Sequence, residues 1–314
     1  MAQRIIPAPQ STAGWDAAKR TAIKGLERIS INSADQIRNY IPLIYKPKKF
    51  SELSIVYPIY SGMKNAVAWD GKSVITPQGI AYLWDVTAQV YLYANGTEYT
   101  FESELWDIYG MRSKQAKELG KSLSYKEQLT AFSFLNNAFT TAWSDGVYFF
   151  HASHPKSTQI GGTFSNIVSG GFAFDTFLDA LILGENMVDP LNRPIYQEAE
   201  RLFVHSTKVP YARMVINASL NWRGGSANND ENPFKRHGRV SAEDFVVGVP
   251  SAYGWSTTQW AVKFSGSELY HNPQVPIKML KPEDTPAHGV KQDGVFANAF
   301  WAEGVTGWVG STGL

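Results

Sequence analysis

The sequence predicts an α+β fold organised around one long helix. Three observations lead to this prediction: a strand-rich stretch at 51–101, a helical pattern at 102–142, and a second β-rich region from 246 onwards. The chain has 314 residues, 44% hydrophobic and 18% charged, which is enough to bury a substantial core. Its ten Trp, fifteen Tyr and seventeen Phe need surfaces to pack against, either in that core or at subunit contacts, where aromatic residues are enriched.

Residues 1–50 are predicted to form an arm rather than a compact unit. They hold nine Lys/Arg against three Asp/Glu, so the rest of the chain is net −5 although the whole is +1. Such an arm can contact phosphates or an acidic partner, although a solvated helix face is an equally good interpretation. The candidates for contact with DNA or an acidic partner are Lys19, Arg20, Lys24 and Arg28.

Residues 51–101 alternate apolar runs with turn signals. Asp70-Gly71 and Asn95-Gly96 lie between apolar runs and predict hairpins. The first hairpin, from about Tyr60 to Tyr82, is too long and too polar at its tip to lie in a core. It is predicted to be a projecting two-stranded ribbon that needs a partner surface, because an isolated ribbon is only marginally stable.

Residues 102–142 give the clearest helical pattern, with apolar residues at steps of three and four. A helix of about 35 residues would be about 50 Å long, although Gly110 and Gly120 weaken the prediction that it is unbroken. After it, "DGVYFFHASHP" (145–155) predicts an apolar strand that stops at His-Pro. Further along, "FDTFLDALILGENM" and "VPYARMVINAS" predict helices and "RLFVHS" predicts a strand.

No catalytic, cofactor-binding or metal-binding residue is assigned. Without Cys there is no thiolate ligand or nucleophile. His151 and His154 form H-x-x-H, but they lie in a predicted strand without a third ligand, which favours local hydrogen bonding. The Gly-rich stretch 160–171 lacks the Gly-Lys-Ser/Thr of a phosphate loop. No stretch approaches the roughly 20 apolar residues of a membrane span, and residues 1–10 lack a signal-peptide core, so no membrane contact or export is expected.

A carbohydrate-binding module is the alternative function. Such modules stack sugars on exposed aromatic side chains, and the C-terminal half is rich in tryptophan. The long helix argues against this alternative. The candidate platform residues are Trp222, Trp255, Trp260, Trp301 and Trp308.

The order of the motifs resembles a known family. The runs are "YKEQLTAFSFLNNAFTTAWSDGVYFFHASHP", "GGTFSNIVSGGFAFDTFLDALILGENMVDPLNRPI" and "LFVHSTKVPYARMVIN". In this order they resemble tailed-phage major capsid proteins of the Mu-like head-subunit type. The closing "DGVFANAFWAEGVTGWVG" is similar to the terminal strand of those proteins. The strong part covers about 130–220, with a looser match over 50–314; each motif is weak, and their order and spacing carry the resemblance.

The resemblance implies the Hong Kong 97-like capsid fold, with an N-terminal arm, an extended β-hairpin loop, a peripheral domain with a long spine helix, and an axial domain. The implied boundaries are 1–55 for the arm, 56–98 for the extended loop and its base, 99–195 for the peripheral domain with its spine helix at about 104–140, 196–270 for the axial domain, 271–308 for the return strands and 309–314 for a tail near the axial domain. "DGVYFFHASHP" would then be a structural joint.

The implied function is structural. The chain would be the major head protein of a tailed double-stranded DNA virus, assembling from pentamers and hexamers into an icosahedral shell around the genome, without catalysis or cofactor. It would be made in the host cytoplasm and located in the virion. Implied partners are other copies, a portal, a scaffold or decoration protein in some relatives, and packaged DNA bound non-specifically. The inter-subunit candidates are Trp69, Lys72, Tyr82 and Trp84.

Overall fold

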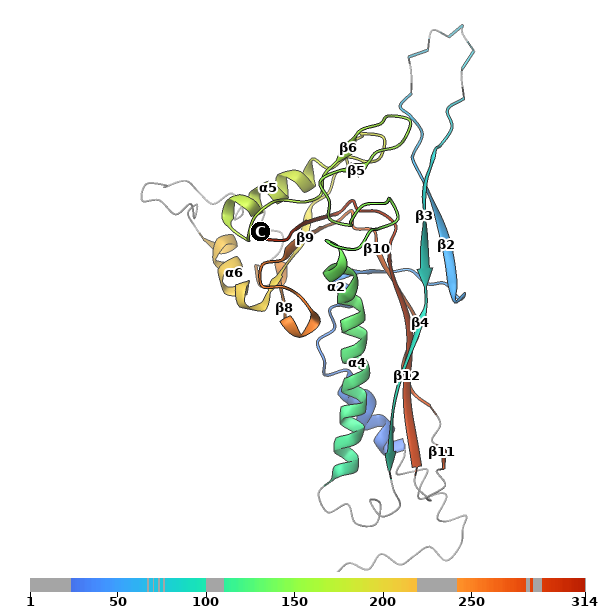
Figure 1. Ribbon diagram of the computed structural model, residues 1–314, viewed down its shortest axis with the longest axis vertical. Helices are drawn as coiled ribbons and strands as arrows, with labels where there is room; N and C mark the ends of the chain where they lie inside the picture. The colour runs from blue at the N-terminus through green and yellow to red at the C-terminus, as the bar shows by residue number, and fades with distance from the viewer. Residues whose placement is uncertain are drawn as a thin grey trace, which may run out of the picture. The chain divides into compact units, whose positions relative to one another are not determined.

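The chain forms two compact units, each with its own core (Figure 1). The computed structural model describes residues 24–66, 68–69, 71–72, 74–75, 77–99, 110–218, 242–280, 283–284 and 290–313. Unit 1 comprises Met1–Asn39, Val90–Gln128 and Pro273–Asn298, and unit 2 comprises Tyr40–Gln89, Leu129–Asn272 and Ala299–Leu314. Mixed helices and sheets confirm the predicted α+β class.

Strand β12 (Val290–Ala302) is central to the sheet of unit 1. On one edge it pairs antiparallel with β4 (Tyr91–Tyr99), in a register that runs from Tyr91 opposite Asn298 to Tyr99 opposite Val290. On the other edge it pairs with β10 (Leu269–Met279) and with β11 (Glu283–Asp284).

The hairpin predicted at Asn95-Gly96 is wrong, because β4 passes straight through both residues. Gly96 lies opposite Asp293, and a Cβ at Gly96 would collide with the Asp293 carboxylate. Glycine at this position therefore makes room for a neighbouring side chain instead of forming a turn.

One face of this sheet is covered by the first part of α4 (Met111–Asn137). Leu119 and Leu123 of α4 pack with Met279 and Phe296 of the sheet, because residues at steps of three and four share one helix face. The pattern predicted a helix of about 35 residues, whereas α4 has 27. It begins after Gly110, whose φ of +64° is not helical; residues 100–109 lie outside the described residues.

A second helix, residues 24–34, lies beside α4 (Figure 1). Its Leu26 packs with Ala116 of α4 and with Tyr99 of β4. The closest approach is at Gly120, where an added Cβ would lie 1.8 Å from the Ser30 carbonyl oxygen. Gly120, which weakened the helix prediction, is therefore the residue that lets the two helices touch.

Unit 2 is built on a four-stranded sheet in the order β13-β9-β7-β8. The two pairings on β7 differ, since β8 runs parallel to it and β9 antiparallel, and β13 runs antiparallel to β9. The strands are β7 (Ala199–His205), β8 (Val246–Val249), β9 (Trp260–Phe264) and β13 (Trp308–Ser311).

Both faces of this sheet are buried, because alternate residues of each strand enter different cores. Leu202 and Val204 join one core while Phe203, between them, joins the other; Trp308 and Val309 divide in the same way. The core that contains Leu202 and Val204 also includes residues of α5 (Phe174–Glu185) and α6 (Val209–Asn217). The two helices and β7 confirm the elements predicted from the sequence.

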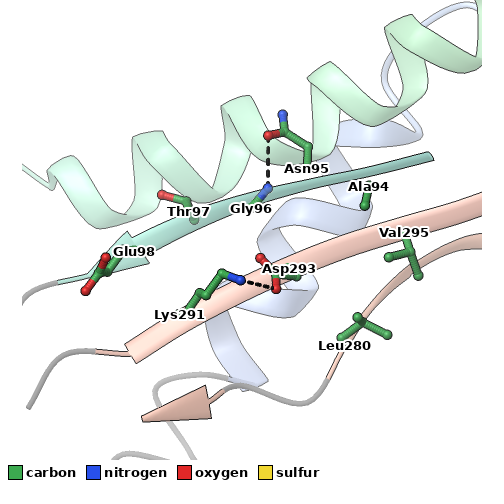
Figure 2. Close-up of a pocket in the computed structure, with 9 residues that line it drawn as sticks. All are labelled: Ala94, Asn95, Gly96, Thr97, Glu98, Leu280, Lys291, Asp293 and Val295. Atoms are coloured by element: carbon green, nitrogen blue, oxygen red, sulfur yellow. Dashed lines mark hydrogen bonds and ion pairs between the residues drawn. The ribbon is translucent and has the colours of Figure 1, made fainter. Parts of the chain in front are cut away.

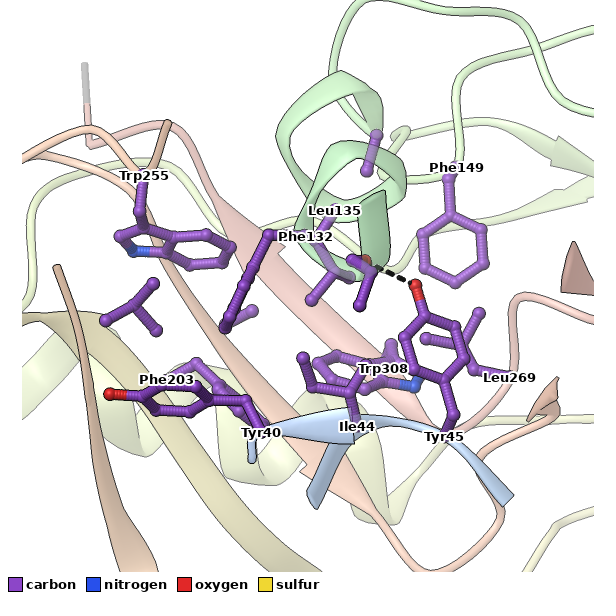
Figure 3. Packing of buried hydrophobic residues seen from close by; sticks show 14 of the residues in the cluster. Tyr40, Ile44, Tyr45, Phe132, Leu135, Phe149, Phe203, Trp255, Leu269 and Trp308 are labelled. Carbon is purple, nitrogen blue, oxygen red and sulfur yellow. Dashed lines mark hydrogen bonds between the residues drawn. The ribbon is translucent and has the colours of Figure 1, made fainter. Parts of the chain in front are cut away.

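The second core contains the last turns of α4 and is rich in aromatic rings (Figure 3). Phe132 and Leu135 are fully buried there, and the Phe132 ring stacks on Tyr253 with centroids 5.3 Å apart. The Tyr45 hydroxyl donates a 2.7 Å hydrogen bond to the Ala131 carbonyl, so a buried phenol is satisfied by a helix carbonyl near the helix end.

Short elements and one ribbon complete the described part of unit 2. The ribbon consists of β2 (Ser54–Tyr60) and β3 (Tyr82–Gln89). The short elements are α2 (Ile41–Ile44), β1 (Lys46–Pro47), β5 (His154–Pro155), β6 (Thr163–Phe164), the 3-10 turns Ser206–Lys208 and Ser251–Tyr253, and α7 (Ala242–Phe245).

We expect Gly120→Ala to destabilise unit 1. Alanine normally favours a helix over glycine by up to about 1 kcal/mol, but here its methyl group would push against the Ser30 carbonyl. Overpacking of this kind costs about 1–3 kcal/mol, measurable by denaturant unfolding. Gly25→Ala is the control, because nothing lies within 4 Å of its added Cβ; equal stability of both variants would contradict this packing.

Candidate assembly surfaces

The β2–β3 ribbon carries a long loop at its end. The strands pair antiparallel from Ser54 opposite Gln89 to Tyr60 opposite Tyr82. The prediction of a ribbon between residues 60 and 82 had the position wrong, since the strand pairing ends at Tyr60 and Tyr82, and Ser61 and Ala81 are hydrogen-bonded next to them. The described residues between 62 and 80 form no strand. The hydrophobic residues of this segment predicted strands, but its described residues pair with no strand of unit 2.

The base of the ribbon is held by a cation and stacked rings, here called the Lys48 clamp. Lys48 lies over the Tyr57 and Tyr270 rings at 4.1 and 4.8 Å and forms an ion pair with Glu303. Tyr57 stacks on Trp301, with ring centroids 5.9 Å apart and planes within 5°. Cation–π contacts and aromatic stacking each add about 0.5–1.5 kcal/mol beyond burial, so the clamp fixes the β2 strand to β10 and β12.

Sequence reasoning missed the Lys48 clamp, and no local signal could have found it. Its members come from four separate segments of the chain, and only the fold brings them together. A further carboxyl, Glu268, lies beside it. Burial raises the pKa of the Glu268 carboxyl, Glu303 adds to the increase, and Lys46 and Lys48 oppose it.

The loop beyond the ribbon exposes hydrophobic side chains. Val74 is 93% exposed and Trp69 is 58% exposed. Met63, Ile75 and Ile80 are also exposed. Exposed groups of large apolar residues are typical of protein interaction surfaces.

Two long polar contacts join described residues of the loop to the rest of unit 2. Arg193, which is paired with Asp189, donates a 3.4 Å hydrogen bond to the Met63 carbonyl. Gln159 donates a 3.4 Å bond to the Gly79 carbonyl. These contacts lie near the start and the end of the loop.

The four predicted inter-subunit residues occupy different environments. Trp69 and Lys72 lie in the loop and are exposed. Tyr82 is also exposed and contacts the Tyr60 ring edge-on at 6.1 Å. Trp84, in contrast, packs edge-on against Trp143 of the same unit, with centroids 5.3 Å apart. Two of the four therefore lie on the loop, Tyr82 is exposed where β3 begins, and Trp84 packs at the base; their role between subunits stays a prediction.

The four predicted cationic residues divide between described and undescribed parts of the chain. Lys24 and Arg28 are exposed on the helix 24–34, one turn apart. Lys19 and Arg20 lie outside the described residues. Two of the four are therefore surface cations on an ordered helix of unit 1.

The opening of the joint at 145–155 is a turn, but the predicted strand is wrong. Gly146 has a φ of +90°, and the Trp143 N–H donates a 2.7 Å hydrogen bond to the Val147 carbonyl. Beyond it the chain is irregular until His154. The Phe150 N–H donates to Ala138 and the His151 N–H to the Asn166 side chain, so no neighbouring strand supplies a ladder.

His154 holds this joint together and is completely buried. The Asn166 side chain donates to the Phe149 carbonyl at 2.7 Å and accepts from the His151 N–H at 2.9 Å, which fixes its oxygen. His154 Nε2, 3.1 Å from that oxygen, must therefore donate. His154 Nδ1 lies 2.6 Å from the Asp145 carboxylate. Local hydrogen bonding of the histidines is thus confirmed, and in the described residues no cluster of three His, Asp or Glu could hold a metal.

A shallow pocket of about 540 Å³ lies on the sheet of unit 1 (Figure 2). It is lined by Ala94–Glu98 of β4, by Lys291, Asp293 and Val295 of β12, and by Leu280, and it includes the 2.9 Å Lys291–Asp293 ion pair.

The prediction that tryptophans of the C-terminal half form sugar platforms is wrong for the four that the structure describes. Trp255, Trp260, Trp301 and Trp308 are each at most 3% exposed, and Trp222 lies outside the described residues. A platform must expose a ring face, whereas Trp260 and Trp308 are among the largest fully buried side chains. The aromatic residues of the C-terminal region therefore belong to the core.

Comparison with known proteins gives a family and a fold. The model of the "Mu-like prophage major head subunit gpT" family matches residues 100–207. Over these residues the chain is similar to the major head subunits of Mu-like prophages. The match lies over α4, the joint and β7, and overlaps most of the region whose motifs showed the resemblance in the sequence. The chain has no match among the curated proteins.

Solved structures show the fold independently of sequence. The capsid of the cyanophage P-SCSP1u matches with a TM-score of 0.55 and 14% identity, covering 86% of this chain and 87% of that one. The capsid of a native GTA particle matches at 0.55 and 12%, covering 88% and 92%. A virus-like particle from Pyrococcus furiosus matches at 0.52 and 9%, covering 92% and 98%. The chain therefore has the Hong Kong 97-like fold. Within the described residues, no helix combines the length and hydrophobicity needed to cross a membrane.

We expect Glu268→Gln to stabilise the protein at pH 7. Burial raises the folded-state pKa of Glu268 above its ordinary 4.5. Between these two pKa values the folded protein binds a proton at Glu268 that the unfolded protein does not, so the free energy of unfolding falls as the pH rises through this range. The variant should raise the midpoint of thermal unfolding by about 2–4 °C at pH 7, with the gain disappearing below about pH 4. Glu185→Gln, at an exposed carboxyl of the same unit, is the control. A gain that does not depend on pH would be evidence against this cause.

We expect His154→Ala to be strongly destabilising. It would leave the Asp145 carboxylate, whose side chain is 1% exposed, buried without its partner, a change that costs about 3–5 kcal/mol. His151→Ala is the matched control, because that ring is partly exposed and accepts only the Ser153 N–H. Denaturant unfolding of both variants measures the difference, and a loss below about 1 kcal/mol for His154→Ala would show that the pair is not structural.

Proposed function

We propose that the chain is a major capsid protein whose copies assemble through the loop at 62–80, which lies on a neighbouring copy in pentamers and hexamers of an icosahedral shell. The observation that carries the proposal is the set of exposed hydrophobic side chains on that loop, above a base fixed by the Lys48 clamp. A rigid base presents the loop in one direction, while its apolar side chains supply the binding energy.

The shell forms through repeated heterologous contacts, in which a surface of one copy meets a different surface of the next. Each contact can be weak, because a subunit that touches several neighbours gains from multivalency. Pro58, within β2 and opposite Asp85, has no N–H for a further strand and discourages uncontrolled edge pairing. The role is structural, with no catalytic step.

Further partners belong to the same proposal. The shell encloses double-stranded DNA, which it contacts non-specifically, and it meets a portal and, where the virus has them, a scaffold or decoration protein. We keep the predicted boundaries of the arm, the peripheral domain and the axial domain as the proposed domain organisation of each subunit. Support for this organisation comes from the order of motifs in the sequence and from the shared fold.

Deleting residues 64–80 and joining the ends with a short Gly-Ser linker tests the role of the loop. We expect a soluble protein with native circular dichroism that forms no shells, measured by size-exclusion chromatography and negative-stain electron microscopy. The two cores of unit 2 do not include this segment, so folding should survive. Normal shells from the deletion variant would refute the proposal.

A finer variant tests whether hydrophobic contact is the cause. Val74→Ser, Ile75→Ser and Ile80→Ser together should raise the protein concentration needed for assembly at least tenfold, since each burial is worth about 1.5–3 kcal/mol. The control triple changes Ile160, Ile182 and Met214 to Ser, which are exposed elsewhere on unit 2. If both triples impair assembly equally, general surface hydrophobicity, and not the loop, is responsible.

A further inference from the structure

We propose that the outer surface of the two-helix layer of unit 1 binds the phosphate backbone of double-stranded DNA. The surface, here called the basic face, consists of Lys24, Arg28, Lys114, Lys117 and Lys121. This inference deepens the proposed function and rests on it for the identity of the partner. It adds three lysines of α4 to the cations that the sequence suggested.

The two helices run in the same direction, side by side. Leu26 packs with Ala116, and Gly120 meets the backbone of Ser30. Further along, the Gln128 side chain donates a 3.2 Å hydrogen bond to Asn39. Contacts therefore advance together along both segments, and this register places Lys24 level with Lys114, since each lies two residues before a contact residue.

Both helices turn their cations away from the sheet. In α4 the buried positions Ala116, Leu119 and Leu123 face the sheet or the helix 24–34. Lys114 and Lys117 are exposed, and the Lys121 side chain is 44% exposed. Steps of three and four keep these lysines in one stripe, spaced about 4.5 and 6 Å along the axis.

The second row of cations is formed in the same way. Leu26 and Ser30 are buried against α4 and β4, whereas Lys24 and Arg28 are exposed. They lie one turn apart on the opposite side of the helix 24–34. Each of the two adjacent helices, drawn in blue and green in Figure 1, therefore carries an exposed row of cations on the side away from its own buried contacts.

Most of this charge is not neutralised within the described residues. Glu118 pairs with Lys121 at 2.9 Å; no carboxylate of the described part of the chain pairs with Lys24, Arg28, Lys114 or Lys117. The nearby Arg38 is exposed as well, and Arg112 lies over the Tyr99 ring at 5.4 Å. The surface therefore has a net positive potential that attracts a polyanion.

The form of the basic face favours DNA over an acidic protein. It is formed by exposed side chains on the outsides of two adjacent helices. Four of its five cations are lysines, which contact phosphates as flexible point charges. Such contacts position a duplex without reading its sequence, as non-specific binding to packaged DNA requires.

The test is salt-dependent binding of the full-length, unassembled protein to a 40-base-pair duplex, followed by fluorescence anisotropy. If five cations contact phosphates, affinity should fall about 500-fold between 50 and 200 mM salt. In the variant Lys114→Gln, Lys117→Gln, Lys121→Gln, two cations remain and the fall should be only about 12-fold. Lys24→Gln with Arg28→Gln tests the other row independently, should the triple variant fail to fold.

The control variant changes Lys49, Lys208 and Lys278 to Gln, which removes the same charge from exposed positions elsewhere and should leave the salt dependence unchanged. A Lys19→Gln, Arg20→Gln variant separates the preceding residues from the basic face. Loss of salt dependence in that variant or in the control, but not in the α4 triple, would overturn the proposal.

Two further measurements separate the possible outcomes. Polyglutamate of matched charge should compete at least tenfold less well than the duplex; equal or stronger competition would assign the basic face to an acidic protein and overturn the DNA proposal. Electron microscopy of the wild type and the triple variant without DNA reports on assembly alone. Absence of shells from the wild type would contradict the proposed function, whereas the anisotropy result stands by itself.

Discussion

The structure of unit 2 depends on one constraint: a four-stranded sheet whose two faces are both buried. Because side chains alternate along a strand, each strand must supply an apolar residue to both cores. β9, with five buried residues in Trp260–Phe264, meets this requirement without a polar interruption except Lys263. The Lys263 ammonium, whose pKa is lowered by burial, pairs with Glu200 and donates to the Leu43 carbonyl at 3.1 Å.

This double burial explains why β13 belongs to the sheet. Trp308 fills one core and Val309 the other, while the Trp308 Nε1 donates a 2.7 Å hydrogen bond to the buried Ser267 hydroxyl. Gly310 lies against the Phe150 ring, where a Cβ would be 2.7 Å away. Strand β13 is therefore packed against the joint that follows α4, through the Phe150 ring in the middle of that joint.

A rigid frame and an exposed loop suit a shell subunit. The Lys48 clamp joins the ribbon to strands that are themselves buried, so the loop is directed by the core and not by its own contacts. Unit 1 has a different construction, with a sheet covered on one face by two helices in contact at Gly120. This arrangement leaves the charged sides of those helices exposed, and the fold thus presents an apolar surface on one unit and a cationic surface on the other.

The sequence by itself determined the α+β class, helices α5 and α6, strand β7 and the family resemblance, because these depend on local periodicity and on motif order. It also located the exposed segment around Trp69, since hydrophobic residues flanked by turn signals stand out in one dimension. It could not show that Asn95-Gly96 lies within a strand, because that outcome depends on Asp293, about 200 residues away.

Only the tertiary structure decided which aromatic residues are buried and which cations share a surface. Trp308 and Trp69 have similar local contexts, with glycine nearby in both, yet one is a core residue and the other is exposed. Likewise, the helices that carry Lys24 and Lys114 lie side by side only because Gly120 lets them touch. Burial and charge clustering are properties of three-dimensional packing between distant segments, so no local pattern in the sequence specifies them.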